Sequence, residues 1–471
     1  MERLCGERCA VVSKGMNRVA FVSLGCAKNL VDSEVMIGKL GAAGWQLVPE
    51  ATDADAVVIN TCAFIDAAKA ESTDTILLHA AQKKAGQQLI VAGCLSQRFG
   101  EELRALVPEI DGVVGTGAYA SIVEVLDEAR AGLGPVRLGF EAEPEHDFLP
   151  RLVTTPRATA YLKVAEGCDH PCTFCIIPKL RGAFRSRSRV SILMEARALA
   201  AAGTRELILI AQDTSMYGRD RGQRRGGLAQ LLEELSAIEG LEWIRLLYLY
   251  PATVDDELID AMARLPKVCK YMDMPLQHAH PEVLRAMLRP SNGERYLEIL
   301  SEFRQRIPGI TMRSTFIVGF PGETDEHVAY LEEWIARAEL DRVGFFTYSR
   351  EEGTPGAALP AQVPAKVKRQ RLLRLREAQR LASGRAREKR VGRVERVLVE
   401  ERRVLRKSDP LRGVLGPAPV WAGRSMGEAP GVDGGVYFAG DASVGEFVDV
   451  RLDGATAFDF HGTRVAAMVG V

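Results

Sequence analysis

The strongest constraint on the fold is a repeated alternation, in the middle of the chain, between short β-rich runs and helical patterns. Six β-rich runs occur there, each separated from the next by a helical pattern, at 161–165, 206–211, 243–249, 271–275, 312–318 and 342–349. Strands that alternate with helices form parallel sheets, because each helix returns the chain to the same edge. Six consecutive units predict a partial barrel, two units short of an eightfold one.

The flanking regions predict two further domains. Before the barrel, the runs "RVAFVSLGC", "DAVVINTC" and "QLIVAGC" alternate with helical patterns and predict a parallel α/β sheet. After it, short strands between Gly and Asp turns predict a small all-β barrel. We therefore expect an α/β protein with a disordered leader at 1–17, an N-terminal sheet domain at 18–131, a linker at 132–158, the partial barrel at 159–385 and the β-barrel at 386–471.

Composition gives no overall attraction to nucleic acid or to a membrane. The 471 residues include 61 Lys plus Arg against 62 Asp plus Glu, so any such partner would have to be recognised by a local patch. No apolar run reaches the ~18 residues of a membrane span, and the N-terminus lacks the apolar core of a signal peptide, whether Met1 or Met16 is the start. We expect a cytoplasmic protein whose nine cysteines are metal ligands or free thiols.

Three cysteines form the motif C-x3-C-x2-C in the loop after the first barrel strand, at Cys168, Cys172 and Cys175. Ligands of parallel α/β barrels collect at this carboxyl face. Structural zinc sites and cubane iron–sulfur clusters have four positions to fill. Three ligands leave one position open, and the motif favours a cluster with a vacant corner over a zinc site or unrelated thiols.

Three more cysteines each end one of the predicted N-terminal strands, at Cys26, Cys62 and Cys94. Neighbouring parallel strands end side by side, so these thiols are expected to meet at one point of the sheet edge. Buried core cysteines are the alternative, but the same ending on three strands favours a second three-cysteine site. The others are expected to be incidental: Cys5, Cys9 and Cys269.

These motifs resemble a known enzyme family over nearly the whole chain. The cysteine loop on a partial barrel resembles the radical S-adenosylmethionine (SAM) superfamily. The three-cysteine sheet domain and the following TRAM-like barrel resemble its methylthiotransferases. The segments "SLGCAKNLVDSE", "NTCAFI", "MPLQHAHPEVLRAMLRP" and "FDFHG" are similar to the RimO-type enzymes, whereas MiaB-type relatives tend to carry Gly-Cys-Gln-Met-Asn in the first motif. Ala27 departs from the proline usual in RimO-type sequences, but it is not a ligand.

The resemblance implies two 4Fe-4S clusters, one on each set of three cysteines. In the superfamily, SAM chelates the open iron of the barrel cluster, and its one-electron cleavage yields a 5′-deoxyadenosyl radical. The N-terminal cluster is implied to hold the sulfur that one SAM methylates, and a second SAM supplies the radical that takes hydrogen from the substrate carbon. The protein positions and shields this cofactor chemistry.

For the RimO type, the implied substrate is the β-carbon of an aspartate in small-subunit ribosomal protein S-twelve. The implied partners are that protein or the ribosome, a low-potential electron donor such as flavodoxin or ferredoxin, and a sulfur donor that stays unknown. An unactivated C–H bond requires a radical, and the chain offers no Ser/His/Asp or paired-carboxylate arrangement for it. The alternatives are a tRNA (adenosine) methylthiotransferase of the MiaB type and a cluster-bearing carrier, which would have no use for open irons.

Six residues on or after the barrel strands are candidate SAM contacts: Gln212, Asp213, Arg245, Gln277, Gly319 and Pro321. Arg245 could instead serve a structural ion pair. His278 and His280, beside Gln277, could line the site or stabilise a turn. The Gly-Phe-Pro-Gly segment that begins at Gly319 could be a tight turn or could let the backbone approach a flat ligand.

Two charged segments leave the substrate open. The helical pattern at 366–390 contains eleven Lys or Arg against two Glu, which would suit RNA but is more commonly a solvated face. In 391–471, acidic residues occur within and between the predicted strands. An acidic face would suit a basic ribosomal protein.

Overall fold

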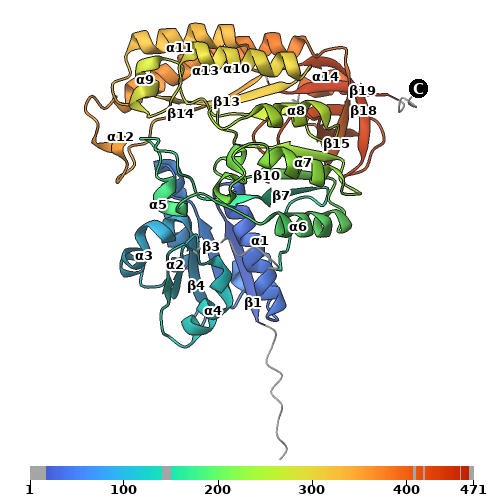
Figure 1. Ribbon diagram of the computed structural model, residues 1–471. Helices are drawn as coiled ribbons and strands as arrows, with labels where there is room; N and C mark the ends of the chain where they lie inside the picture. Colours follow the sequence, from blue (N-terminus) through green and yellow to red (C-terminus); the bar gives the residue numbers. More distant parts are fainter. Residues whose placement is uncertain (1–16, 141–149, 407–409, 417–418, 457, 466–471) are drawn as a thin grey trace, which may run out of the picture.

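The computed structural model (Figure 1) describes residues 17–140, 150–406, 410–416, 419–456 and 458–465. The expectations for the leader, for Cys5 and Cys9, and for a start at Met1 or Met16 concern residues outside this part of the chain. Figure 1 shows the N-terminal sheet domain below the partial barrel, and the C-terminal barrel beside it. Within the described residues, no helix combines the length and the apolar character needed to cross a membrane.

The N-terminal domain is a parallel sheet of six strands in the order β2-β1-β3-β4-β5-β6. The strands are β1 (Arg18–Ser23), β2 (Gln46–Leu47), β3 (Ala56–Thr61), β4 (Gln88–Gly93), β5 (Gly112–Val114) and β6 (Val136–Arg137). Its helices are α1 (Ala27–Ala42), α2 (Asp66–Ala81), α3 (Cys94–Leu106) and α4 (Ile122–Arg130). The predicted strands are confirmed as β1, β3 and β4. The other three are too short to show periodicity, and β6 falls within the expected linker.

All six predicted barrel strands are present, as two parallel sheets in the orders β11-β10-β7 and β12-β13-β14. They are β7 (Thr159–Lys163), β10 (Glu206–Ile210), β11 (Trp243–Leu246), β12 (Tyr271–Asp273), β13 (Thr311–Val318) and β14 (Arg342–Thr347). A two-stranded ribbon of β8 (Ala165–Glu166) and β9 (Arg185–Ser186) follows β7. The helices are α5 (Ile177–Arg181), α6 (Arg189–Ala201), α7 (Gly227–Ser236), α8 (Asp256–Arg264), α9 (Pro281–Ala286), α10 (Gly293–Arg306), α11 (Asp325–Ala338) and α12 (Pro355–Ala358).

The basic segment forms the long helix α13 (Ala365–Glu388), which leads into a closed five-stranded barrel in the order β15-β16-β17-β19-β18. The strands are β15 (Val394–Arg403), β16 (Val420–Arg424), β17 (Val436–Ala439), β18 (Phe447–Ala455) and β19 (Phe460–Arg464), with α14 (Pro410–Leu415) after β15. The small all-β barrel is therefore confirmed.

One apolar cluster joins the three parts of the molecule. It contains Val31 from α1, Ile208 and Tyr271 from the partial barrel, and Leu398 and Ala429 from the C-terminal region, all nearly inaccessible. A six-stranded barrel has an open side, and the apolar residues along it must be covered to be stable. The N-terminal helix and the C-terminal barrel supply that cover.

Buried ion pairs reinforce the contact with the C-terminal barrel. The Arg245 guanidinium lies 2.8 Å from Glu206, with both side chains fully buried, and it also donates to the backbone carbonyls of Ser425 and Met426. Arg424 pairs with the same carboxylate at 2.5 Å. Burial alone would raise the pKa of Glu206, but the charges of Arg424 and Arg245 lower it to about 2. Arg245 is thus in the structural ion pair that was the alternative to a SAM contact.

We expect Glu206→Gln to destabilise the protein by about 3 to 5 kcal/mol, because it leaves buried arginines without their carboxylate. The matched control is Glu242→Gln, since Glu242 pairs with Arg205 and Arg396 at the surface and is 33% exposed. That loss should stay below about 1 kcal/mol. Urea titration of both variants measures the free energies of unfolding, and equal losses would contradict the assignment of the buried pair.

Candidate active site

The barrel cysteines, which we call the barrel triad (Cys168, Cys172 and Cys175), lie in the loop between β8 and α5. The Cys168 N–H donates to the carbonyl of Gly182 at 3.1 Å, and the Cys175 N–H to that of Cys172 at 3.1 Å. Gly167, with φ +81°, precedes the loop, and a Cβ there would lie 1.9 Å from the carbonyl oxygen of Ala183. Only glycine lets the two ends of the loop approach this closely.

The barrel-triad thiols are close enough to act on one another. Burial raises the pKa of Cys168 to about 11 and that of Cys175 to about 12, and the neighbouring thiols of the triad contribute a smaller part of each increase. Such thiols stay protonated unless a cation compensates their charge, and iron binding is one way to supply it. The donor set therefore fits a 4Fe-4S cluster held at three corners.

The N-terminal cysteines, which we call the sheet triad (Cys26, Cys62 and Cys94), follow the adjacent strands β1, β3 and β4. Cys26 is exposed and caps α1, whereas Cys62 and Cys94 are buried. A Cβ on Gly25, which precedes Cys26 at φ +89°, would lie 2.8 Å from the Cβ of Cys62. Burial raises the pKa of Cys94 to about 12; the charge of Arg181 opposes this increase, and Cys26 and Cys62 contribute a smaller part of it. The structure brings these three thiols to one edge of the sheet, as their strand-end positions predict.

Each triad has one arginine against one of its sulfurs. Arg181, at the end of α5, lies 3.8 Å from Cys94 Sγ, and Arg289, after α9, lies 3.9 Å from Cys172 Sγ. The Arg289 guanidinium also sits over the ring of Tyr250 and donates to the carbonyl of Pro275. Hydrogen bonds to ligating sulfurs tune the reduction potential of iron–sulfur clusters. Neither arginine was singled out from the sequence, because a run of basic residues does not reveal which one is buried.

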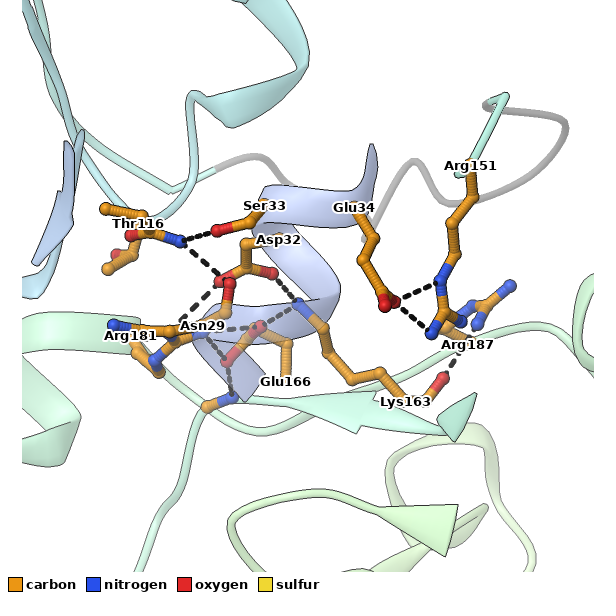
Figure 2. A network of polar contacts seen from close by, with 12 residues as sticks. Asn29, Asp32, Ser33, Glu34, Thr116, Arg151, Lys163, Glu166, Arg181 and Arg187 are labelled. Atoms are coloured by element: carbon orange, nitrogen blue, oxygen red, sulfur yellow. Dashed lines mark hydrogen bonds and ion pairs between the residues drawn. The ribbon is translucent and has the colours of Figure 1, made fainter. Parts of the chain in front are cut away.

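Arg181 belongs to a buried set of two cations and two carboxylates, which we call the charged network: Asp32, Lys163, Glu166 and Arg181 (Figure 2). Arg181 donates to both oxygens of Glu166 at 3.0 Å and to Asp32 at 3.1 Å. Lys163 donates to both carboxylates. Burial alone would raise the pKa of Glu166, but the charges of Arg181 and Lys163 lower it well below its usual value.

The charged network connects the two triads. Asp32 lies on α1, which follows Cys26 directly, while Glu166 and Arg181 flank the barrel-triad loop. Asn29, one turn before Asp32, accepts from Arg181 at 2.5 Å and donates to the carbonyl of Thr61, next to Cys62. The same side chains therefore fix helix α1, the end of β3 and the barrel loop against one another.

Gln212 and Asp213 both lie beside the barrel loop, after β10. Gln212 donates to Glu166 at 2.7 Å, and its own carbonyl oxygen is buried without a partner among the described residues. Asp213 accepts from His170 of the loop at 2.7 Å and from Thr253. The His170 ring stacks on Tyr250, with centroids 3.7 Å apart. Asp213 thus supports the loop, whereas Gln212 keeps an acceptor free for a ligand.

The glycine turn after β13 is packed against the chain itself. A Cβ on Gly319, at φ +76°, would lie 2.4 Å from the side chain of Lys368 on α13, so glycine is needed for that helix to approach. Pro321 is buried in the same turn. Gln277, with φ +73°, forms a bridge to Phe316 of β13. The structure places all three in loops at the carboxyl face, but it favours the tight-turn interpretation of Gly319.

The histidines near Gln277 stabilise local structure. His280, Glu282 and His327 place possible metal ligands within 4.8 Å of one another. However, the backbone N–H groups of Glu282 and Thr324 donate to the Nδ1 atoms of His280 and His327. A neutral ring that accepts at Nδ1 carries its proton on Nε2, which leaves no lone pair for a metal. His278 Nδ1 likewise accepts from the backbone of His280. Cys269 is a buried thiol whose pKa burial raises to about 12.

Comparisons with known proteins agree with this arrangement. Three family models match consecutive parts of the chain: Uncharacterized protein family UPF0004 at residues 18–115, the Radical SAM superfamily at 162–335 and the TRAM domain at 391–465. Among solved structures, the radical SAM methyltransferase TsrM from Kitasatospora setae matches with TM-score 0.54 and 17% identity over 72% of this chain and 77% of that one. The cobalamin-dependent SAM radical enzyme OxsB matches with a TM-score of 0.51 and 14% identity, over 78% of this chain and 56% of that one. These structural similarities show the fold alone.

Curated relatives are similar over nearly the whole length. Several of them are named ribosomal protein uS12 methylthiotransferase RimO. The one from Desulfitobacterium hafniense is 44% identical over 454 residues, and this match covers 95% of this chain and 98% of the relative. The one from Geobacter sulfurreducens is 44% identical over 465 residues, covering 97% and 100%. That from Symbiobacterium thermophilum is 46% identical over 451 residues, covering 94% and 90%.

The partial barrel with its cysteine loop, the sheet domain and the TRAM domain define the protein as a radical SAM methylthiotransferase. Within that class the near-full-length similarity is more specific. The chain belongs to the family of ribosomal protein uS12 methylthiotransferases, RimO.

Anaerobic reconstitution should load about eight irons per chain, four on each triad, since each set of three thiolates fills three corners of a cubane cluster. Replacing the whole barrel triad by alanine should leave about half that iron. Iron analysis of the two proteins gives the ratio. An unchanged iron content in the triple variant would show that the barrel triad holds no cluster.

Arg181→Lys and Arg289→Lys should each shift the reduction potential of one cluster to a more negative value. Lysine keeps the charge but loses the guanidinium contact with the thiolate, and such hydrogen bonds favour the reduced cluster. Redox titrations followed by electron paramagnetic resonance, with the other triad replaced by alanine, separate the two signals. Arg181→Lys should shift only the sheet-triad cluster, and Arg289→Lys only the barrel-triad cluster. A shift of both clusters by either variant would contradict the pairing of arginines with triads.

Proposed function

We propose that this protein inserts a methylthio group at the β-carbon of an aspartate in ribosomal protein uS12. The single observation that carries the proposal is the near-full-length similarity to relatives with the uS12 methylthiotransferase name. The two cysteine triads, held together by one buried network, support it, because the reaction needs sulfur handling and radical generation on the same carbon. We place the reaction in the cytoplasm, with uS12 or the assembled ribosome as the partner.

In this proposal each triad holds one 4Fe-4S cluster, and SAM binds at the barrel triad. Bound there, SAM supplies a 5′-deoxyadenosyl radical on reduction and a methyl group for sulfur. The chain's own residues then orient the bound SAM and shield it from water. Gln212 offers its buried free acceptor to the polar groups of SAM. Asp213 and His170 hold the cysteine loop in place through their 2.7 Å contact. A low-potential donor such as flavodoxin or ferredoxin would deliver electrons, and the sulfur donor is left open.

Part of the basic run that could have indicated RNA is paired within the protein. On α13, Arg371 pairs with Glu323 and Asp325, and Arg374 pairs with Glu332. These two side chains hold the helix against the partial barrel, whereas four other basic residues of the run are exposed and form no salt bridge with a described residue: Lys366, Arg369, Arg376 and Arg385.

Several acidic side chains of the C-terminal barrel are paired as well, although Asp441 and Asp449 form no salt bridge with a described residue. Glu401 pairs with Arg403, Asp453 with Arg451, and Glu446 with Arg464. This weakens the expectation of an acidic docking face for a basic ribosomal protein. The charge of neither segment decides between uS12 and tRNA, and the substrate proposal therefore does not rest on it.

Mass spectrometry of uS12 from cells with and without the gene tests the proposal. The wild-type gene should add the mass of a methylthio group to one aspartate, and the deletion should leave uS12 unmodified. Complementation with Cys62→Ala should also leave uS12 unmodified, since Cys62 belongs to the sheet triad.

The purified Cys62→Ala protein should nevertheless cleave SAM to 5′-deoxyadenosine when reduced, because its barrel triad is intact. Cys172→Ala is the matched control and should lose that cleavage. If uS12 is unmodified in wild-type cells while tRNA carries the new methylthio group, the tRNA alternative replaces this proposal. Loss of all SAM cleavage in folded Cys62→Ala protein would contradict the division of labour between the triads.

A further inference from the structure

Lys28, near the start of α1, is a buried cation that forms no salt bridge with any residue the structure describes. It is only 7% exposed. Its ammonium lies 3.1 Å from the centroid of the Tyr248 ring. Among the described residues it forms no hydrogen bond and no salt bridge. An aromatic face attracts a cation and holds it in place, but it carries no formal negative charge to neutralise it.

The carboxylates near Lys28 are already committed to other groups. Of the neighbouring groups, the Cys26 thiol of the sheet triad acts most strongly on its charge, followed by Arg181, and the carboxylates of Asp273 and Glu166 act less strongly. Asp273 accepts from Arg313 at 2.6 Å and from the Tyr248 backbone at 3.0 Å. Glu166 is held by Arg181 and Lys163 in the charged network. Because no described carboxylate is bonded to Lys28, a carboxylate from outside the chain can form a hydrogen bond with its ammonium.

Lys28 connects the helix that follows the sheet triad with a loop at the carboxyl face of the partial barrel. Lys28 is two residues after Cys26 of the sheet triad, on the helix that Cys26 caps. Tyr248 follows β11 in a loop at the carboxyl face of the partial barrel, where the barrel triad also lies. The substrate carbon has to meet both the sulfur and the radical, so it must enter between these two regions.

Tyr248 is held in an uncommon backbone conformation that presents its ring to Lys28. Its φ is +62°, which is rare for a residue with a large side chain. The backbone is fixed on both sides, by the Tyr248 N–H to Asp273 at 3.0 Å and by the Thr214 N–H to the Tyr248 carbonyl at 2.9 Å. Backbone strain that is held in this way is concentrated at functional sites.

We propose that the Lys28 ammonium binds the side-chain carboxylate of the substrate aspartate and so presents its β-carbon to the two cofactor sites. This inference rests on the proposed function, because it takes the uS12 aspartate as the substrate. The target carbon is bonded directly to that carboxylate, so one charge-assisted hydrogen bond fixes its position. Lys28 is then a residue that determines specificity for aspartate over its uncharged isostere.

The test compares uS12 with a variant uS12 that carries asparagine in place of the target aspartate, as competing ligands of the reconstituted full-length enzyme. Wild-type enzyme should bind the aspartate form about ten- to a hundredfold more tightly, as one charge-assisted hydrogen bond would give. Lys28→Met has nearly the same length without the charge and should lose this preference. Lys28→Arg should recover part of it. Lys39→Met, which removes a lysine from the same helix further along, should keep the wild-type ratio.

Iron content and melting temperature show whether each variant is folded and loaded. If folded Lys28→Met retains the wild-type preference for aspartate, the proposal is overturned. It is also overturned if Lys28→Met alters only the resonance signal of the sheet-triad cluster, because Lys28 would then serve that cluster's charge. If wild-type enzyme neither binds nor modifies uS12, the proposed function fails first, and this inference fails with it.

Discussion

The charged network at the centre of the molecule fixes the geometry on which the rest of the structure depends. Its two cations and two carboxylates come from α1, from the end of β7, from β8 and from α5, and Lys163 is wholly inaccessible. Removing one partner from such a set would leave an uncompensated buried charge, which typically costs about 3 to 5 kcal/mol. The network therefore permits one arrangement of the N-terminal domain on the barrel. Because the triads sit on the same segments, their relative position is fixed too.

The incomplete barrel explains why the chain needs its other two domains. Six strands leave the barrel open, and the residues along the opening are as apolar as those of a core. Helix α1 covers part of this surface, and the C-terminal barrel covers another part through Leu398 and Ala429. The ion pair of Glu206 with Arg245 and Arg424 adds a directional contact to the second interface. The opening thus becomes a junction between domains, which is where two cofactor sites can face one substrate.

Much of this arrangement follows from the sequence, and the exceptions share one cause. Strands long enough to show a periodicity were predicted, and cysteines at strand ends indicated which edge of each sheet carries the chemistry. The charged network was missed because Asp32 and Lys163 are 131 residues apart and each looks like an ordinary helix or strand residue. Arg245 and Gly319 were considered for ligand binding, but their nearest neighbours come from the C-terminal region. Sequence patterns indicate local structure, whereas the role of each of these residues depends on which distant segment of the chain packs against it.

The first two turns of α1 carry two groups of polar side chains with different electrostatic surroundings. Asn29 and Asp32 are held by Arg181, and that side of the helix belongs to a network whose formal charges cancel. Lys28 lies beside the Tyr248 ring instead, and its charge is not cancelled by any described carboxylate. A buried unpaired ammonium costs several kcal/mol, and an apolar residue would make the free protein more stable. Local rules are broken in this way at functional sites. The network gives the junction its rigidity, and Lys28, which no described carboxylate neutralises, gives it a preference for an acidic side chain.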